Sequence, residues 1–210
     1  MGPEMPSGDY ACRFAPDGWD EQDWIQVKSP RWDHPGGWVQ RGEHIENRVP
    51  PDASPAQLLG VRAGETYSSM VLARAPVQEV RVRAVVSCDD RMAPLVVLAG
   101  PLDTNHRGAP EYRQHIEIAL FDEGVNVWHH TWTEAGGPAW NKAAWWACDL
   151  ASGTPHELVV ERRGPNLSLS VDSRHCGCRR EGLPDAGRPG LTGCEGVTRF
   201  YEFAILKSED

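Results

Sequence analysis

The twenty residues from Tyr112 to Thr131 constrain the fold most, because their side chains alternate between apolar and polar. A period of two is typical of a β-strand that buries one face and exposes the other. The run Asp122-Glu123-Gly124 interrupts the alternation and supplies a turn. The segment therefore predicts an antiparallel β-hairpin with one apolar and one polar face.

The polar face of this hairpin gathers titratable and aromatic groups. If the polar sides of the two strands coincide, one patch contains Arg113, His115, Glu117, Asn126, Trp128 and His130. Flat aromatic rings cover the C–H face of a sugar, while imidazole, amide and carboxylate groups form hydrogen bonds with its hydroxyls. The pattern favours a neutral, polyhydroxylated ligand.

The rest of the chain adds further short strands and almost no helical periodicity. Alternating or apolar segments occupy 66–73, 79–88, 94–99, 143–150, 156–162, 166–172 and 199–206, and 54–59 is the one helix-like segment. Nine or ten strands in succession predict an all-β fold, an antiparallel β-sandwich. We expect a single domain over 1–210, with a loop-rich part at 1–60 that holds short edge strands at 23–27 and 38–40, and the main sandwich at 65–206.

Composition narrows the classes of partner. The formal net charge is −9 and no stripe of Lys and Arg stands out, which argues against nucleic acid or an anionic membrane as a partner. No apolar run is long enough to span a bilayer. The first residues have no secretory signal pattern, so we expect a cytoplasmic protein and leave an extracellular one open. The oligomeric state is not readable from the sequence.

Cysteine spacing does not indicate a disulfide scaffold or a zinc site. Six cysteines in 210 residues are too sparse for such a scaffold, and we expect most of them to be buried thiols. The run His175-Cys176-Gly177-Cys178 lacks the second ligand pair of a zinc site, so we predict a turn there.

The C-terminal third has a characteristic order of strands and turns. A strand at 156–161, a turn at Gly164, a strand at 167–172 that ends in Asp, a Gly-Leu turn at 190–193 and an aromatic last strand at 200–205 follow one another. This order resembles the closing strands of the concanavalin A-like lectin/glucanase superfamily, and the resemblance extends in general character over 65–206. It implies a jelly roll of two curved antiparallel sheets that binds carbohydrate on its concave face.

The resemblance also implies a test for hydrolysis. Glucanases of this superfamily carry Glu-x-Asp-x-Glu, or a bulged Glu-x-Asp-x-x-Glu, on one strand, because retention of configuration needs two carboxyl groups close together. In this chain Glu117 is followed by Ala119 and Phe121, and Asp122 replaces the second Glu only if the strand is bulged. The carboxylate pair is broken.

Two other chemistries remain open on the same hairpin. Polysaccharide lyases of this fold need a His or Tyr base, an Arg and an amide. Those residue types are present as Tyr112, Arg113, Gln114, His115 and His130, of which only Arg113 and His115 face the same way on their strand.

A His/Glu/His metal shell of His115, Glu117 and His130 is sterically conceivable, whereas a hydrogen-bonded polar cluster is the commoner use of such residues. We therefore assign no metal ligand and no cofactor. For a structural calcium, which this superfamily usually holds in loops, Asp89-Asp90 and Asp103-Thr104-Asn105 are the segments to inspect.

Nine tryptophans suggest stacking surfaces. Trp145 and Trp146 are adjacent on a strand, so they point to opposite faces. With Cys148 and Leu150 inward, Trp146 is buried and Trp145 lies beside Trp128. We place two more at the rim, in the loop around 136–138, namely Trp132 and Trp140.

These observations favour a protein that recognises a carbohydrate or glycoside on the concave face. The expected binding residues are Arg113, Asn126, Trp128, Trp132, Trp140 and Trp145. One alternative is a saccharide-active enzyme, a glycoside hydrolase or polysaccharide lyase, in which Glu117 and either His115 or His130 act as acid and base. The other is a structural or interaction module whose tryptophans belong to the core.

Overall fold

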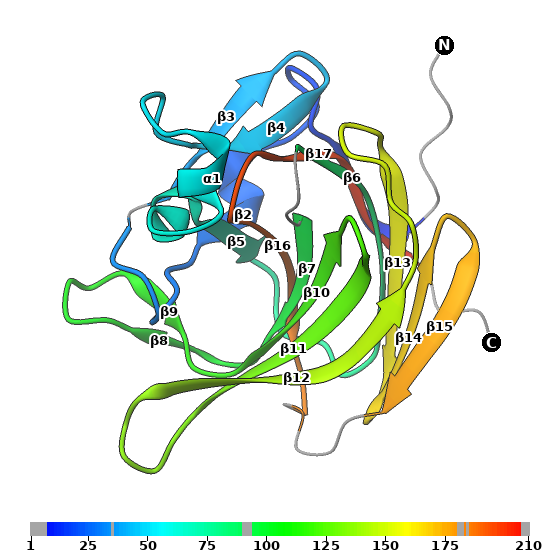
Figure 1. Cartoon of the computed structure of the whole chain (residues 1–210). Coiled ribbons are helices and arrows are strands. Elements are labelled where there is room, and N and C mark those ends of the chain that lie inside the picture. The colour runs from blue at the N-terminus through cyan, green and yellow to red at the C-terminus, as the bar shows by residue number, and fades with distance from the viewer. Residues whose placement is uncertain (1–7, 35, 90–93, 180–182, 184, 207–210) are drawn as a thin grey trace.

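Two large antiparallel sheets, packed face to face, form the body of the molecule (Figure 1). The computed structural model describes residues 8–34, 36–89, 94–179, 183 and 185–206. The predicted antiparallel β-sandwich is confirmed. The strands are more numerous than expected, because several short ones lie in segments without clear alternation.

The first sheet contains, in spatial order, β15 (Arg174–Arg179), β14 (Asn166–Val171), β13 (His156–Arg163), β6 (Val80–Cys88), β17 (Thr198–Leu206), β4 (His44–Asn47) and β3 (Trp38–Arg41), with β1 (Gly8–Arg13) paired to β17. The second contains β12 (Pro138–Ala147), β11 (Gly124–Trp132), β10 (His115–Phe121), β7 (Pro94–Ala99), β16 (Arg188–Gly193), β5 (Ser68–Leu72) and β2 (Trp24–Gln26). A separate ribbon pairs β8 (Leu102–Thr104) with β9 (Pro110–Tyr112).

The helical segments are short. They are the 3₁₀ helices η1 (Glu21–Asp23) and η2 (Ala63–Thr66) and the α-helix α1 (Pro55–Leu58), which lies within the helix-like segment expected at 54–59. The Ser54 side chain accepts a hydrogen bond from the Gln57 backbone, and the Gln57 side chain accepts one from the Ser54 backbone. This capping box explains why the helix begins at Pro55. Among the described residues, no helix is long and apolar enough to cross a membrane.

The main core fills the space between the two sheets. Ile116, Ile118 and Leu120 of β10 face it from one side, and Phe200 and Phe203 of β17 face it from the other. All five side chains are at most 2% exposed. Burying each contributes about 1.5–3 kcal/mol, so this apolar face fixes which side of β10 turns inward.

The predicted hairpin is present as β10 and β11. Pairs run without a shift from His115 with His130 to Phe121 with Gly124, and Glu117 lies opposite Trp128. Directly paired residues share a face, so His115, Glu117, Trp128 and His130 all point away from the main core. The predicted register is correct.

Three local expectations are wrong. The chain bends at residues 113 and 114, so Tyr112 belongs to β9 and β10 begins only at His115. The Gly190-Leu191 pair, expected in a turn, lies inside β16 between β5 and β7. The segment 175–178, also expected in a turn, lies in the edge strand β15. In both strands, ladder hydrogen bonds override the turn preference of glycine.

A β-bulge separates two halves of the β11–β12 pair. Val127 lies opposite Ala144, but Trp128 lies opposite Lys142, so Ala143 is the extra residue. Side chains five positions apart point to opposite faces of a regular strand. Because of the bulge, Trp140 and Trp145 nevertheless lie on the same face, opposite His130 and Asn126 respectively.

The close approach around Gly190 gives a stability prediction. A Cβ atom at Gly190 would lie 2.4 Å from the Met70 carbonyl oxygen and 2.9 Å from the Val71 Cα, both on the backbone of β5. We expect Gly190→Ala to lower the free energy of unfolding by about 1–3 kcal/mol, because β5 must move aside. Chemical denaturation measures the change.

Gly177→Ala is the matched control for this substitution. It also adds one methyl group to a strand glycine, but the nearest atom, the Leu167 carbonyl oxygen, would be 3.7 Å away. We expect a change within about 0.5 kcal/mol. Equal losses for the two variants would contradict the steric explanation.

Candidate functional site

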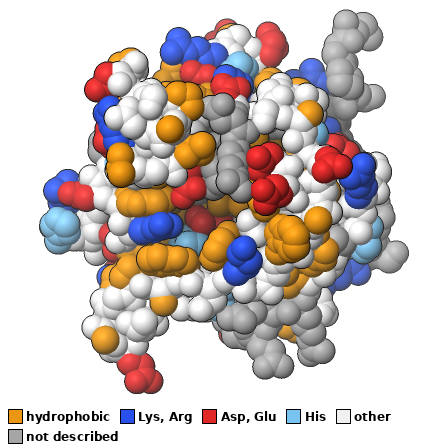
Figure 2. All heavy atoms as spheres, in the orientation of Figure 1, with side chains coloured by type: hydrophobic (Ala, Val, Ile, Leu, Met, Phe, Trp, Pro, Cys, Tyr) orange, Lys and Arg blue, Asp and Glu red, His pale blue; other side chains and the backbone are white. Residues whose placement is uncertain are grey.

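A cavity of about 520 Å³ lies on the face of the second sheet that points away from the main core. Figure 2 shows this side of the molecule, hollowed near its centre and bordered by hydrophobic and charged side chains. The cavity is lined by Ser29, Arg31, Trp32, Leu59, Tyr67, Leu95, Glu117, Ala119, Phe121, Asn126, Trp128, His130, Trp140, Cys194 and Glu195. Its volume is in the usual range for small-molecule sites.

A buried carboxylate with two imidazoles forms one part of the cavity wall. Glu117 is 8% exposed. His115 Nε2 lies 3.2 Å from Glu117 Oε1 and donates a hydrogen bond to it. His130 Nε2 lies 2.8 Å from Glu117 Oε2, which is close enough for an ion pair. The angle between the two groups does not fit a hydrogen bond. Each carboxylate oxygen therefore has its own imidazole.

The environment of this cluster shifts two pKa values. Burial raises the pKa of Glu117, but His130 and His115 outweigh that effect and hold this pKa well below its usual range. Burial lowers the pKa of His115 by more than the Glu117 carboxylate raises it. At neutral pH, Glu117 is thus ionised and His115 neutral.

Stacking holds the His115 ring in place. The ring lies 4.2 Å from the Tyr112 ring and 4.3 Å from the His130 ring, at interplanar angles of 26° and 15°. The Tyr112 hydroxyl is in turn hydrogen-bonded to Ser69 Oγ at 2.7 Å. His115 is therefore sandwiched between two flat groups, and its Nε2 is directed at Glu117.

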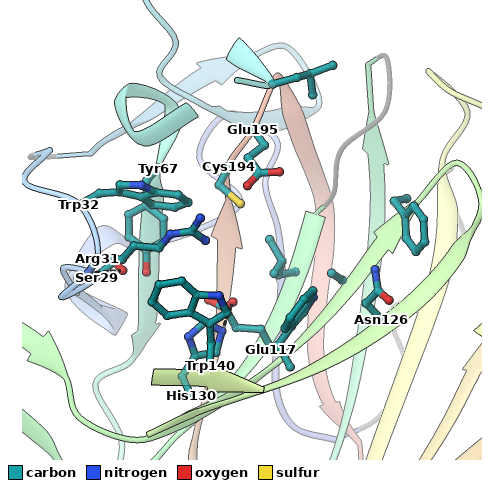
Figure 3. A pocket seen from close by; sticks show the side chains of 15 residues that line it. Ser29, Arg31, Trp32, Tyr67, Glu117, Asn126, His130, Trp140, Cys194 and Glu195 are labelled. Carbon is teal, nitrogen blue, oxygen red and sulfur yellow. Dashed lines mark hydrogen bonds and ion pairs between the residues drawn. The ribbon is translucent and has the colours of Figure 1, made fainter. Parts of the chain in front are cut away.

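Arg31 joins the N-terminal loops to the β11–β12 hairpin. Its guanidinium carbon lies 4.5 Å from the Trp32 ring centroid and 4.7 Å from the Trp140 ring centroid. Figure 3 shows the guanidinium between the two indoles, at one side of the cavity. We call Trp32, Arg31 and Trp140 the Trp–Arg–Trp stack.

A second carboxylate reaches the cavity from the end of β16. Glu195 follows directly after Cys194 and has a φ of 54°, and its backbone N–H donates a hydrogen bond to the Thr66 hydroxyl oxygen, 2.6 Å away. In Figure 3 its carboxylate points into the cavity from the side opposite Glu117. Burial raises the pKa of Glu195, and the Glu117 charge raises it further against the opposing effect of Arg31.

Five of the predicted site residues line the cavity. These are Glu117, Asn126, Trp128, His130 and Trp140. His115 lies behind them, 2% exposed, and contacts the cavity through Glu117. Trp140 comes from β12 itself, and the loop around 136–138 contributes no lining residue.

Three predicted residues lie outside the cavity lining. Arg113 pairs with Asp103 at 2.6 Å and covers the Trp132 ring at 3.9 Å, because the bend at 113–114 takes it off β10. The Trp132 Nε1 donates to the Tyr112 carbonyl oxygen at 3.3 Å. Trp145 lies on the cavity side of β12 but is 51% exposed, beyond the cavity lining. Trp146 packs against the core, as predicted.

The side chains suggested for calcium are engaged in other contacts. Both carboxylate oxygens of Asp89 accept hydrogen bonds from Arg199, at 2.6 and 2.7 Å. Asp103 accepts from Arg113 and from the Thr104 backbone. Asp90 lies outside the described residues.

Several solved structures have a similar fold over most of this chain. A carbohydrate-binding module, CBM66 from Bacillus subtilis, shares 13% identity, with a TM-score of 0.58 and coverage of 89% of this chain and 96% of the module. A glycoside hydrolase family 16 endo-glucanase from Bacteroides ovatus shares 12% identity, with a TM-score of 0.59 and coverage of 94% and 99%. A protein of unknown function with a galectin-like fold, also from Bacillus subtilis, shares 11% identity, with a TM-score of 0.64 and coverage of 97% of each chain.

The chain has a concanavalin A-like jelly-roll fold. At these identities the likeness concerns the fold alone. No protein-family model and no curated protein sequence matches the chain. The similarity to the solved structures confirms the fold that was predicted from the closing strands.

Strand β10 does not carry the carboxylate pair that the sequence analysis expected of a glucanase with this fold. Ala119 and Phe121 follow Glu117 along the same face of β10 and line the cavity where that pattern would place Asp and Glu. The β10–β11 register has no shift between His115 and Phe121, so Asp122 stays in the turn. The prediction that the pair is broken agrees with this geometry.

Most lining residues that the sequence did not indicate come from irregular parts of the jelly roll. They are Ser29, Arg31, Trp32, Leu59, Tyr67, Cys194 and Glu195, and Leu95 joins them from strand β7. Most of them lie in loops or next to short helices, where no periodicity assigns a face. The one available signal was Trp32, because an indole in a loop is difficult to bury without a partner surface.

The Trp–Arg–Trp stack gives a prediction about local stability. We expect Arg31→Ala to lower the free energy of unfolding by about 1 kcal/mol and to speed amide hydrogen exchange in residues 28–33, because two cation–π contacts are lost. Hydrogen exchange by mass spectrometry measures the local effect. Arg41→Ala, which removes an exposed ion pair with Glu46, is the control and leaves exchange at 28–33 unchanged.

Proposed function

We propose that the protein binds a saccharide in the cavity of its second sheet. One observation carries the proposal: aromatic walls enclose polar atoms that have unused hydrogen-bonding capacity. Asn126 Oδ1 is buried, borders the cavity and has no hydrogen-bond partner among the described residues. A buried acceptor without a partner is costly, and a ligand hydroxyl would satisfy it.

The distribution of groups around the cavity supports a sugar over an apolar ligand. Trp128 and Trp140 offer indole surface of the kind that covers the C–H side of a pyranose, and Trp140, with Arg31 over one face of its ring, is still 42% exposed. The Glu117 carboxylate supplies an acceptor for hydroxyls, and the Arg31 guanidinium supplies donors. The combination of flat apolar surface and fixed polar groups is what orients a polyhydroxylated ring.

The solved structures of similar fold suggest which saccharides to test. They include a carbohydrate-binding module, a Bacteroides ovatus enzyme of a mixed-linkage glucan locus in complex with a product, and a Clostridium perfringens endo-β-galactosidase. We therefore choose mixed-linkage glucan oligosaccharides and β-galacto-oligosaccharides as the first probes.

Binding to these probes tests the proposal through tryptophan substitutions. We expect Trp128→Ala and Trp140→Ala each to weaken the binding of the retained probe at least about tenfold, because each removes a stacking face. Isothermal titration calorimetry measures the affinity, and circular dichroism checks that each variant is folded.

Trp145→Ala is the matched control. Trp145 lies on the same strand and on the same side of the sheet as Trp140, but it does not line the cavity. We expect its affinity to remain within about twofold of the wild type. No binding of any probe by the wild-type protein, or equal losses in all three variants, would count against a saccharide site in the cavity.

A second candidate function is hydrolysis of the bound saccharide, and Glu195 is the observation that favours it. The cavity holds two carboxyl groups in different environments: Glu117 with a lowered pKa and Glu195 with a raised one. Two carboxyl groups whose pKa values are driven apart are typical of an acid and base pair. In this reading Glu195 donates a proton to the leaving oxygen, and Glu117 acts as base or nucleophile.

Glu195→Gln separates catalysis from binding. If the protein is a hydrolase, the substitution lowers kcat at least about 100-fold while affinity for the oligosaccharide changes little, because the amide has the same shape but no transferable proton. Release of reducing ends measures turnover. Absence of turnover in the wild type would leave the binding proposal in place and exclude hydrolysis of the saccharides tested.

A further inference from the structure

The His115, Glu117 and His130 side chains converge on one point. His115 and His130 are direct partners across the β10–β11 pair, and Glu117 is two residues along the same strand as His115. Such positions place three side chains on one face. Their ligand atoms, two imidazole nitrogens and one carboxylate oxygen, all lie within 4.8 Å of one another.

The distances within the cluster are close to those of a metal coordination shell. Ligands at about 2.1 Å from a tetrahedral zinc ion lie about 3.4 Å apart. Here His115 Nε2 and His130 Nε2 lie 3.2 and 2.8 Å from the two Glu117 oxygens. Small rotations of the His130 and Glu117 side chains would therefore suffice to admit an ion.

The local geometry also shows a contact that an ion would improve. His130 Nε2 lies at ion-pair distance from the carboxylate without hydrogen-bond alignment. The Glu117 side chain is 11% exposed and shares the cavity lining with the apolar residues Leu95 and Ala119. A divalent cation between the three groups would neutralise the buried charge and accept one Nε2 lone pair from each imidazole, and the ring proton of His115 would then lie on Nδ1 instead of Nε2.

The type and number of donors narrow the kind of ion. Two imidazoles and one carboxylate are the ligand set of catalytic zinc sites and of non-haem iron sites. Calcium takes six to eight oxygen ligands, which this cluster does not supply. Because Glu117 and His130 line the cavity, the remaining coordination positions of an ion would face it.

We propose that His115, Glu117 and His130 bind one divalent transition-metal ion at the wall of the cavity, with zinc as the ion to test first. Stacking of the His115 ring between Tyr112 and His130 orients its Nε2 before any ion binds. The proposal goes beyond saccharide binding and does not depend on it, because the metal alone is the probe.

Metal titration of the full chain, without an affinity tag and after dialysis against a chelator, tests the site. We expect calorimetry with zinc chloride to give one ion per chain. We expect Co²⁺ to give the visible absorption of a low-coordinate nitrogen and oxygen site. Glu117→Gln and His130→Gln should each weaken zinc binding more than about 100-fold, since loss of a ligand exceeds the 10–100-fold cost of losing a second-shell partner.

His106→Gln is the matched control. His106 is exposed in the loop between β8 and β9, away from the cluster, and the substitution leaves zinc affinity unchanged if surface histidines do not account for the binding. Circular dichroism shows whether each variant is folded. Because Glu117 is the more deeply buried residue, His130→Gln, with a 20% exposed side chain, keeps the test valid if Glu117→Gln fails to fold.

The proposal is overturned by two results. One is a wild-type chain that takes up no stoichiometric zinc or cobalt. The other is binding that a folded His130→Gln variant retains in full. Either result leaves the saccharide proposal untouched, because oligosaccharide titrations of the same chelator-treated protein, with no metal added, measure saccharide binding independently.

Discussion

The register between β10 and β11 is the constraint on which the rest of the site depends. Ile116, Ile118 and Leu120 are drawn into the core by burial of apolar surface, which determines the direction of every other side chain on the strand. Glu117 is thereby kept on the opposite face, next to His115 and across from Trp128. A shift of one residue would place the carboxylate between the sheets, where it has no partner.

The cavity arises because irregular segments cover this face of the sheet. Arg31 and Trp32 come from a loop after β2, whereas Cys194 and Glu195 come from the end of β16. The strands supply one side of the cavity through Glu117, Asn126 and Trp128, and the loops supply the other (Figure 3). The sheet alone would present an open polar surface, and the loops add the second side of the cavity.

How far the sequence predicts this structure depends on periodicity. Alternation in 112–131 was sufficient to predict the hairpin, its register and four residues of the cavity lining, Glu117, Asn126, Trp128 and His130. Arg113 was misplaced because a bend of two residues, which alternation does not reveal, ends the strand early. Arg31 and Glu195 were not found, because a loop residue has no periodic face and its neighbours are fixed only by tertiary packing. Strand β16 was missed because its Gly and Pro residues are typical of turns, and only its two neighbouring strands stabilise it as a ladder.

The bulge at Ala143 shifts the alternation of side chains in β12, so that residues 138–142 are out of phase with residues 144–147 compared with a regular strand. On the outer half, Trp140 and Lys142 face the cavity side, and on the inner half Trp145 does so. In a regular ladder that retained Ala143, residues 138–142 would have the opposite phase and Trp140 would point to the back of the sheet, with the core half of the strand unchanged. The Trp–Arg–Trp stack therefore depends on the bulge, which offsets the odd spacing between Trp140 and Trp145 along β12.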